Sequence, residues 1–409
     1  MTRKQHVITI LILGALATIS PFSIDMYLPG FPAIAADLHT SIARVQLSLT
    51  SYLIGIAVGQ LLYGPLLDRF GRKTPLYFGL AVYVLASLVC AFTNSVDALI
   101  AMRLLQALGG CAGIVAAQAL IRDLFPVNEI AQAFSSITLV IAVSPMIAPT
   151  VGGYVTAAFG WHYVFIILAG LTALILIAVY FVLPTGRTAD TSLSLRPGAV
   201  MKNFNSVFRH PQFLVYMLTG GIATSAGFAY IAGSSEVMIT ILGFTEQQYG
   251  WIFAFLAFGL IGSTQLNHIL LKRFTSQQLI LAALVYQTVV GLVLVVGTWY
   301  HWLSPLGLIG LMFVFLTGQG LTNPNATALT LAPFVRHTGS AASLNGFFRM
   351  AIGGLVTGLV SLLHNSTAMP MVGVMVGCAV VGLIVLLIGN SVVRFQASKK
   401  VEEEDSVLL

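Results

Sequence analysis

Three ionisable residues lie well inside long apolar stretches of the sequence: Asp25, Arg103 and Arg349. A charged side chain is costly in hydrocarbon, so such a residue within a membrane span is a candidate for function. Burial favours the neutral form of a carboxyl group, whereas a nearby guanidinium favours the charged form. A carboxyl group balanced between these effects can take up and release protons. We therefore expect proton coupling at Asp25, with Arg103 stabilising the carboxylate.

The depth of these residues follows from helix geometry at 1.5 Å per residue. Asp25 lies about 27 Å along the first apolar segment, and Arg103 lies about 9 Å inside the opposite end of the fourth. Both are expected in the same half of a membrane. The alternative for Asp25 is a helix-end residue at the water interface. Arg349 is expected about 13 Å inside the other face, where it reaches the interface, braces a gate or contacts the substrate.

The elements that must position these residues are membrane helices. Of the 409 residues, 57% are hydrophobic and only 8% are charged, whereas a soluble domain carries about 25% charged residues. This composition excludes a soluble enzyme, a disordered protein and a collagen-like fibre. Because one spanning helix needs roughly 20 apolar residues, the chain has material for about a dozen spans and little for a soluble domain.

The hydropathy pattern predicts an all-α integral membrane protein with twelve spanning helices. The predicted segments are 7–35, 44–66, 74–93, 97–121, 130–159, 162–183, 212–233, 247–269, 277–299, 304–330, 341–364 and 369–394. A polar stretch divides them into two halves of six. The expected organisation is a first bundle at 1–184, a linker at 185–211, a second bundle at 212–394 and an acidic tail at 395–409.

The positions of the basic residues predict the orientation. Most of the 19 Lys and Arg residues fall on one side if the N-terminus is cytoplasmic, as the positive-inside rule requires. Both termini are therefore expected in the cytoplasm. The net charge of +6 reflects this topology, and we expect no nucleic-acid partner.

The segment 64–73 (GPLLDRFGRK) contains the strongest local motif. Gly and Pro end a helix, a second Gly permits a tight reversal, and basic residues hold the loop on the cytoplasmic face. An acid at the helix end can dock a basic partner, for which Arg122 is the candidate; an ordinary positive-inside turn is the alternative. The expected cytoplasmic gate consists of Gly64, Asp68, Arg69, Gly71, Arg72, Arg122 and Arg349.

The fifth apolar segment contains a stripe of prolines and glycines. Pro145 and Pro149 are four residues apart and share a helix face, and Gly152 and Gly153 follow. Proline lacks the backbone N–H that a helix needs, which predicts a bend. Glycine lacks a side chain, which predicts close packing against neighbouring helices.

A substrate pocket is expected from aromatic and polar residues within the helices, since a mostly apolar cavity with a few polar groups suits amphipathic compounds. The pocket candidates, besides Asp25, are Tyr52, Gln118, Phe228, Tyr230, Phe255 and Asn323. The histidines show no metal-ligand spacing, and neither a nucleophile elbow nor a phosphate-binding loop occurs. We therefore expect no metal, no cofactor and no enzymatic activity.

The two halves also resemble each other, because 66–70 (LLDRF) and 270–274 (LLKRF) follow equivalent helices. Residues 64–73 fit the GxLxDrxGRK signature of the major facilitator superfamily. Residues 103–107 resemble the helix 4 signature of its proton-linked members, with Ala107 in place of Gly. Residues 144–153 resemble its antiporter signature, with Ser144 and Ala148 in place of Gly. Further segments resemble the bicyclomycin-resistance branch of bacterial drug/proton antiporters: 23–29 (SIDMYLP), 121–126 (IRDLFP), 161–165 (WHYVF), 208–210 (FRH) and 346–349 (GFFR).

This resemblance implies a transport site between the two halves and a proton-coupled antiporter that crosses the inner (plasma) membrane of a bacterium. Such a protein would export small antimicrobials, such as bicyclomycin or chloramphenicol, by alternating access. Asp25 takes the place of the family's proton- and substrate-linked carboxylate. The expected partners are a small-molecule drug, protons and the lipid bilayer, and the fold is expected to work as a monomer. Alternatives are an exporter of a metabolite, such as the amino acid cysteine, and a receptor or channel that does not transport by exchange.

Overall fold

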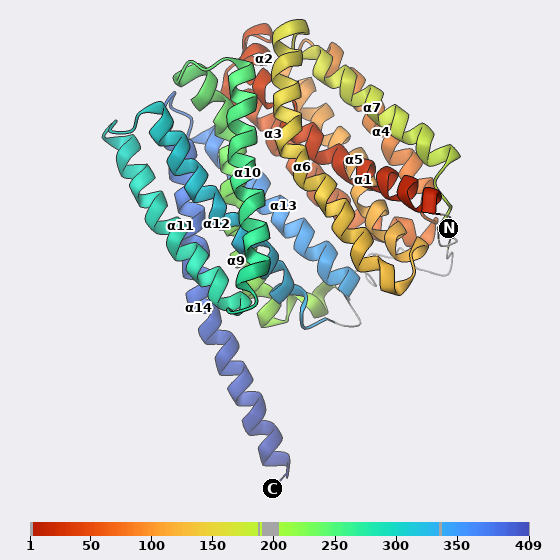
Figure 1. The fold of residues 1–409 in the computed structure, drawn as a ribbon, viewed down its shortest axis with the longest axis vertical. Helices are drawn as coiled ribbons and strands as arrows, with labels where there is room; N and C mark the ends of the chain where they lie inside the picture. Colours follow the sequence, from red (N-terminus) through yellow and green to blue (C-terminus); the bar gives the residue numbers. More distant parts are fainter. Residues whose placement is uncertain (1–2, 187–188, 190–203, 335–337, 409) are drawn as a thin grey trace.

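The computed structural model describes every residue except 1–2, 187–188, 190–203, 335–337 and 409. The helices form two bundles that lie side by side (Figure 1). The first bundle contains α1 (Arg3–Asp25), η1 (Leu28–Gly30), α2 (Phe31–Asp37), α3 (Ile42–Arg69), α4 (Lys73–Phe92), α5 (Val96–Leu124), α6 (Val127–Phe159) and α7 (His162–Phe181).

The second bundle follows the linker, most of which lies outside the described residues. It contains α9 (Pro211–Ser235), η2 (Glu236–Ile241), α10 (Glu246–Leu270), α11 (Ser276–Trp299), α12 (Pro305–Leu331), α13 (Thr338–Leu362) and α14 (Met369–Leu408). We call the end of the bundles where α1 begins the near side, and the end where α2 lies the far side.

The prediction of an all-α membrane protein with twelve spans is confirmed. Within the described part of the chain, twelve helical spans are long and apolar enough to cross a membrane, with α1, η1 and α2 counted as one. Helices suit this environment because they satisfy every backbone polar group internally where no water is present.

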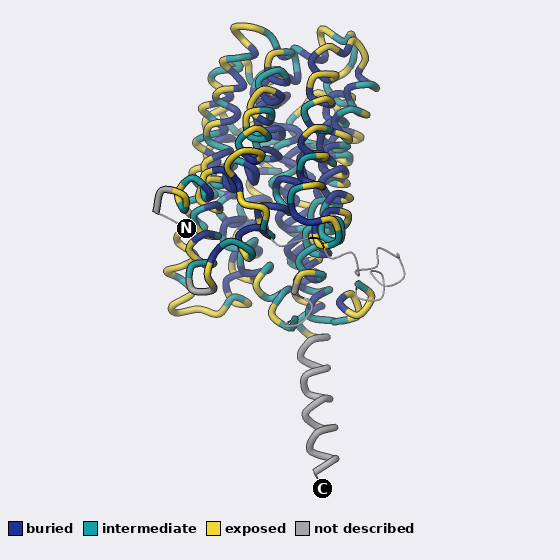
Figure 2. The backbone as a smooth tube through the Cα atoms, turned by 90° about the vertical axis from the view of Figure 1, so that its right-hand side faces the viewer, coloured by how far each residue is buried: buried dark blue, intermediate teal, exposed yellow. Residues whose placement is uncertain are grey.

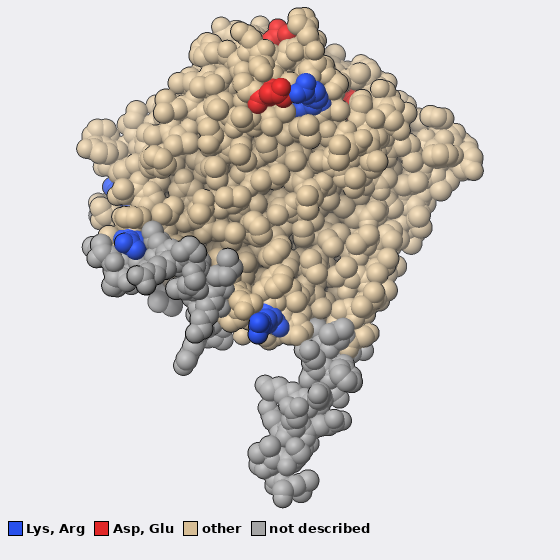
Figure 3. Space-filling view, turned by 180° about the vertical axis from the view of Figure 1, so that it is seen from behind, with Lys and Arg blue, Asp and Glu red and all other residues tan. Residues whose placement is uncertain are grey.

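The surface of the bundles matches a lipid environment. Large apolar side chains such as Phe78, Leu355 and Leu306 are 70–76% exposed, whereas the buried residues lie along the inner faces of the helices (Figure 2). Figure 3 shows a broad band without charged residues between the two ends of the molecule. The fold therefore presents apolar side chains to lipid and keeps its few intramembrane polar groups inside.

The two bundles meet along seams that depend on small residues. Gly346 of α13 lies against the side chain of Gln60 of α3, and Gly354 lies against Ile54. On the other side, Gly250 of α10 packs against the backbone of Thr150 in α6. Because lipid offers no hydrophobic driving force between helices, small residues that allow close approach hold such contacts together.

Candidate functional site

Asp25 is the last residue of α1, where the first membrane span breaks. The sequence predicted one uninterrupted segment at 7–35, but the helix ends at Asp25 and resumes as η1 and α2. The cause is Pro29, which has no N–H to donate to the carbonyl four residues earlier and whose ring clashes with that carbonyl. That carbonyl belongs to Asp25. Proline therefore places the carboxylate at a helix end inside the membrane.

The Asp25 side chain faces the second bundle. The residue is 4% exposed, and among the described residues its carboxylate has neither a hydrogen bond nor an ion pair. It acts electrostatically on the phenol groups of Tyr230 in α9 and Tyr249 in α10. Tyr249 also shares a hydrogen bond of 2.8 Å with Ser234. The carboxylate thus lies at the interface between the bundles, beside two tyrosines.

Arg103 is fully buried inside the first bundle and is not paired with Asp25. Its guanidinium carbon lies 4.3 Å from the ring centroid of Tyr27 and 4.0 Å from that of Tyr52. It donates hydrogen bonds to the Gln106 side chain (2.6 Å) and to the backbone carbonyl of Ser23 (2.9 Å). A buried cation between two rings and two acceptors is well compensated for the loss of water.

The bond from Arg103 to Ser23 supports the end of the helix that carries Asp25. The last carbonyls of a helix lack partners within the helix, and a cation near them interacts favourably with the helix dipole. Beyond Arg103, Gln106 donates to Ser87 (2.7 Å), and Ser23 is bonded to Tyr83. Arg103 thus positions the broken end of α1 through the backbone instead of neutralising the carboxylate directly.

The near-side motif folds into an ion-pair cluster. Arg72 donates to Asp68 (2.6 Å) at the end of α3 and to Asp123 (2.7 Å) at the end of α5. Gly71 supplies the left-handed backbone conformation of the turn, with φ of +79°. Burial lowers the pKa of Arg72, but the hydrogen bonds to Asp123 and Asp68 outweigh this effect and leave the pKa above its usual value. The cluster fixes the loop within the first bundle.

The other expected gate residues do not join this cluster. The expected partner of Asp68 was Arg122, but Arg122 is exposed and its neighbour Asp123 takes part in the cluster instead. Arg69 lies 5.7 Å from the ring of Phe70. Gly64 faces Ser343 of α13 across the interface. Arg349 lies elsewhere on α13, where its Nε is buried without a hydrogen-bond partner.

The proline and glycine stripe of α6 packs where three elements meet. Gly152 lies against the backbone carbonyl of Met26, directly after α1. Gly153 lies against the backbone of Glu246 at the start of α10. Pro149 is buried and contributes its carbonyl to the contact with α10, while Pro145 is half-buried one turn away. Close approach at this stripe therefore joins the broken end of α1 to the second bundle.

The pocket candidates are not brought together in one place. Tyr52 lies under Arg103, and Tyr230 faces Asp25. Phe228 packs against Gly353 of α13. The remaining three are half-buried or exposed: Gln118 is exposed, Phe255 is 50% exposed and stacked on Phe313, and Asn323 is half-buried. Of the pocket candidates, the structure thus places Tyr230 beside Asp25, while Tyr52 packs against Arg103 inside the first bundle.

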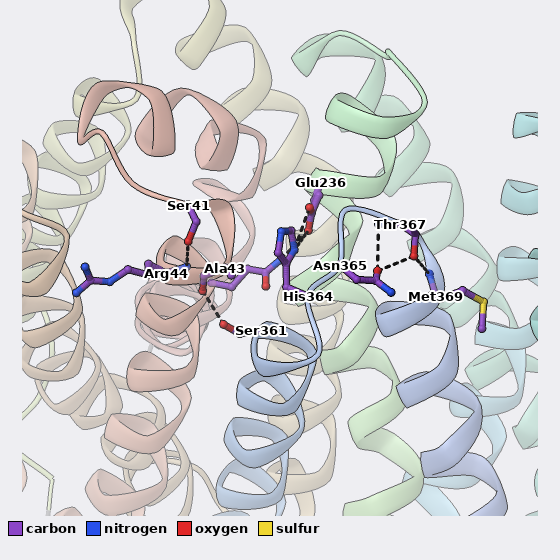
Figure 4. A network of polar contacts seen from close by, with 10 residues as sticks. Ser41, Ala43, Arg44, Glu236, Ser361, His364, Asn365, Thr367 and Met369 are labelled. Atoms are coloured by element: carbon purple, nitrogen blue, oxygen red, sulfur yellow. Dashed lines mark hydrogen bonds and ion pairs between the residues drawn. The ribbon is translucent and has the colours of Figure 1, made fainter. Parts of the chain in front are cut away.

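A second buried carboxylate, Glu236, lies on the far side and was not among the expected site residues. The predicted segment ended at 233, but α9 continues through the π-helical η2, and Glu236 is 7% exposed. Its carboxylate lies 3.1 Å from Nδ1 of His364 and accepts a bond of 3.4 Å from Gln46 of α3. Figure 4 shows Glu236 and His364 pointing toward each other. A hydropathy window extended to residue 241 would have placed the acid inside the span.

Further contacts join the bundles on the far side. Ser361 donates to the carbonyl of Ala43 (2.6 Å), also drawn in Figure 4. One turn deeper, Thr50 and Thr357 share a hydrogen bond of 2.9 Å. Thr150 of α6 donates to the carbonyl of Gly250 (3.1 Å). Together with the contacts of the α6 stripe, these bonds hold the far ends of the bundles together.

Comparison with known proteins identifies the relatives of this chain. The model of the Major Facilitator Superfamily matches residues 13–358. A bicyclomycin resistance protein homolog from Haemophilus influenzae is 33% identical over 388 residues, which cover 93% of this chain and 96% of that protein. Multidrug resistance protein D of Escherichia coli is 28% identical and covers 90% and 91% of the two chains.

A solved structure supports the same fold. A bacterial homolog of the human lysosomal transporter Spinster, solved in an inward-facing and unoccupied conformation, superposes with a TM-score of 0.71. The match covers 95% of this chain and 96% of the other, at 13% sequence identity. At this identity the likeness concerns the arrangement of the helices alone.

Proposed function

Because the chain belongs to the major facilitator superfamily, we propose that it is a proton-coupled antiporter that exports small antimicrobial compounds. The resemblance seen in the sequence is confirmed at the level of the family, and the chain is a multi-pass membrane transporter and not an enzyme. The observation that carries the proposal is Asp25: a buried carboxylate without a hydrogen-bond or ion-pair partner among the described residues, at the interface between two bundles.

The environment of Asp25 favours a change of protonation during transport. A carboxylate away from water and without an ion-pair partner is costly to keep charged. Opening the interface to water on one side lowers that cost, so the group can bind a proton when facing one side and release it when facing the other. Each proton that moves inward through a potential of 100 mV supplies about 2.3 kcal/mol. This energy can drive a drug outward against its gradient.

The proposed orientation puts both chain ends in the cytoplasm of a bacterium and the far side outside. The positive-inside distribution of Lys and Arg in the sequence supports it. In this orientation the ion-pair cluster of Arg72 faces the cytoplasm, and the contacts between Ala43 and Ser361 close the outer end. The cycle needs no second chain, because the helices at the interface all come from one chain.

The test is drug export by Asp25→Asn in everted membrane vesicles. The native chain is expected to move chloramphenicol or bicyclomycin when a proton gradient is applied, and to stop when a protonophore is added. Asp25→Asn is expected to reduce the rate of gradient-driven export by about 100-fold, equal to roughly 2.7 kcal/mol in activation free energy, while still exchanging labelled drug for unlabelled drug. Asp97→Asn is the matched control, because the Asp97 side chain is 71% exposed and pairs with Arg44 of the same bundle at the surface.

Full gradient-driven export by Asp25→Asn would contradict the role proposed for this residue. The substrate class is tested separately, by a drug-susceptibility panel in a host that lacks its own efflux pumps. If no drug protects such cells, metabolite profiling of overexpressing cells examines export of an amino acid instead. The relatives whose names refer to drug resistance support the drug class first.

A further inference from the structure

The cluster of Glu236, His364 and Gln46 lies where the two bundles meet on the far side. Glu236 belongs to the π-helical η2 and His364 follows α13, so both come from the second bundle, whereas Gln46 comes from the first. A π-helical turn inside a longer helix adds a residue and rotates those that follow it, and such turns are frequent at functional sites. Here the turn begins at Glu236 itself.

Closing the bundles has an electrostatic cost at this cluster. In the closed arrangement Glu236 is 7% exposed and Gln46 is 1% exposed. An ionised carboxylate removed from water is expensive unless it is paired and hydrogen-bonded. Gln46 supplies one neutral donor at 3.4 Å. Among the described residues, the partner that can supply a full positive charge is His364, at 3.1 Å. Burial of the pair therefore favours a net charge of zero, which requires one proton shared between Glu236 and His364.

The other charged and titratable groups on the adjoining elements have partners of their own or lie outside this contact. Arg44 of α3 is paired with Asp97. Asp37 of α2 accepts from Trp161 at 3.1 Å. On α10, Tyr249 is bonded to Ser234, and Glu246 lies in the first turn. Among the described residues, the side chains that contact the carboxylate of Glu236 are those of His364 and Gln46.

We propose that Glu236 and His364 form a second proton-binding site, which takes up one proton from the far side when the bundles close. When the far side opens, Gln46 moves away with the first bundle and water reaches the pair, while Glu236 and His364 stay together on the second bundle. A hydrated imidazole is mostly neutral above about pH 6.5 and a hydrated carboxylate is charged. The open pair then holds no proton and the closed pair holds one. His364 keeps 25% of its side chain exposed, so this proton comes from and returns to the far side.

The site rests on the alternating-access part of the proposed function but not on Asp25. Because closing binds a proton, a lower pH on the far side favours the closed state. If the far side is outside, protons would close the outer end after drug release, and the carrier would turn inward with Asp25 already loaded. The second site thus makes the return of the empty carrier depend on outside acidity without carrying a proton across.

The experiment measures the opening of the far side directly. Spin labels are attached at Asn94→Cys in the first bundle and Leu306→Cys in the second, both exposed. The background replaces the three buried native cysteines by Ala and carries Asp25→Asn, which removes the titration of Asp25. The ratio of the short-distance to the long-distance population is expected to rise by about threefold to tenfold per pH unit between pH 8.5 and 7, because one proton is bound on closing.

Two variants decide the outcome. Glu236→Gln is expected to remove the pH response over this range, because a neutral amide and a neutral imidazole need no proton on closing. His364→Gln leaves the buried carboxylate without a cation, so it is expected to lower the closed population instead of removing the response. His162→Gln is the matched control, since His162 lies 3.6 Å from Asp37 in an exposed pair within the first bundle, and it should keep the native response. A response of native size in Glu236→Gln, or an unchanged closed population in His364→Gln, overturns the proposal.

The outcome is separable from the test of Asp25. Full gradient-driven export by Asp25→Asn would remove the proposed role of that residue while leaving the distance measurement valid. A single distance population at every pH, without any change between variants, would contradict alternating access and therefore both proposals.

Discussion

Asp25 and Glu236 are two buried carboxylates at the same interface, and their surroundings differ. They are 4% and 7% exposed, and each lies at an irregular point of its helix: a break before Pro29 for Asp25 and a π-helical turn for Glu236. Glu236 has a histidine and a glutamine as partners. Among the described residues, Asp25 has no such partner.

The difference indicates two ways of using a carboxylate in a membrane. Without a partner, the charge of Asp25 is governed by access to water, which changes sides during transport. Glu236 has His364 within hydrogen-bond distance, and in the proposal the charge of this pair depends on whether the bundles touch. The first arrangement suits a proton that crosses the membrane. The second suits a proton that stabilises one closed end.

The largest expected effect concerns the support of α1 below Asp25. Arg103→Met removes the guanidinium from two rings and leaves acceptors on Ser23 and Gln106 unpaired. We expect a loss of about 3–5 kcal/mol in the free energy of unfolding, typical of breaking a buried charged contact. The measurement is denaturant-induced unfolding of the purified protein in detergent micelles.

Arg44→Met is the control for that measurement, because Arg44 is half-exposed and its pair with Asp97 lies at the surface. It should cost less than about 1 kcal/mol. Equal losses in the two variants would show that Arg103 contributes no more than a surface ion pair, and that the broken end of α1 is held by other contacts.

The sequence predicted the helices and the importance of Asp25 for the same physical reason, namely the cost of polar groups in lipid. It did not predict the partners. Equal depth suggested that Asp25 and Arg103 would meet, but depth says nothing of the helix face, and Arg103 points into its own bundle toward Ser23. The partner of Asp68 illustrates the same limit: Arg122 was expected, but Asp68 pairs with Arg72. Arg122 and its neighbour Asp123 are separated by about 100° of helix rotation, and of these two it is Asp123 that reaches Arg72.

A smaller effect is expected from Pro29→Ala, which tests whether the helix break after Asp25 matters for transport. Alanine restores the N–H that can bond to the carbonyl of Asp25, and helix continuation becomes more favourable by about 3 kcal/mol. Asp25 would then lie inside a helix instead of at its end. We expect gradient-driven export to fall about tenfold while drug-for-drug exchange is retained, measured in the same vesicles. Pro305→Ala is the control, since Pro305 is in the first turn of α12, where proline disturbs no helical bond.

Unchanged export by Pro29→Ala would show that the end of α1 does not determine how Asp25 works. The carboxylate would then differ from Glu236 in its partners only. The helix break would be a matter of packing against Gly152, which lies beside the carbonyl of Met26.

A still smaller effect is expected from Gln46→Leu, which removes the hydrogen bond that joins Glu236 of the second bundle to the first bundle. One hydrogen bond to a charged group contributes about 1.5–3 kcal/mol. Its loss should lower the ratio of closed to open far sides by about tenfold, read from the distances between labels at Asn94→Cys and Leu306→Cys. The pH response should remain, because the pair of Glu236 and His364 is intact. Loss of that response in Gln46→Leu would assign the proton dependence to contact between the bundles and not to the pair.

The smallest effect is expected at the far-side hydroxyl bonds. Thr357→Val keeps the shape of the side chain but removes its share of the bond to Thr50. A neutral hydrogen bond contributes about 0.5–1.5 kcal/mol, so the closed population should fall by less than about tenfold, with no change in pH response. Because Thr50 and Thr357 carry no charge, they test whether closure depends on the number of bonds at the seam or on the charge of Glu236. If Thr357→Val lowers the closed population as much as Gln46→Leu does, closure depends on the number of hydrogen bonds at the seam. The charge of Glu236 would then have no special role in closure, and the contrast with Asp25 would be weaker.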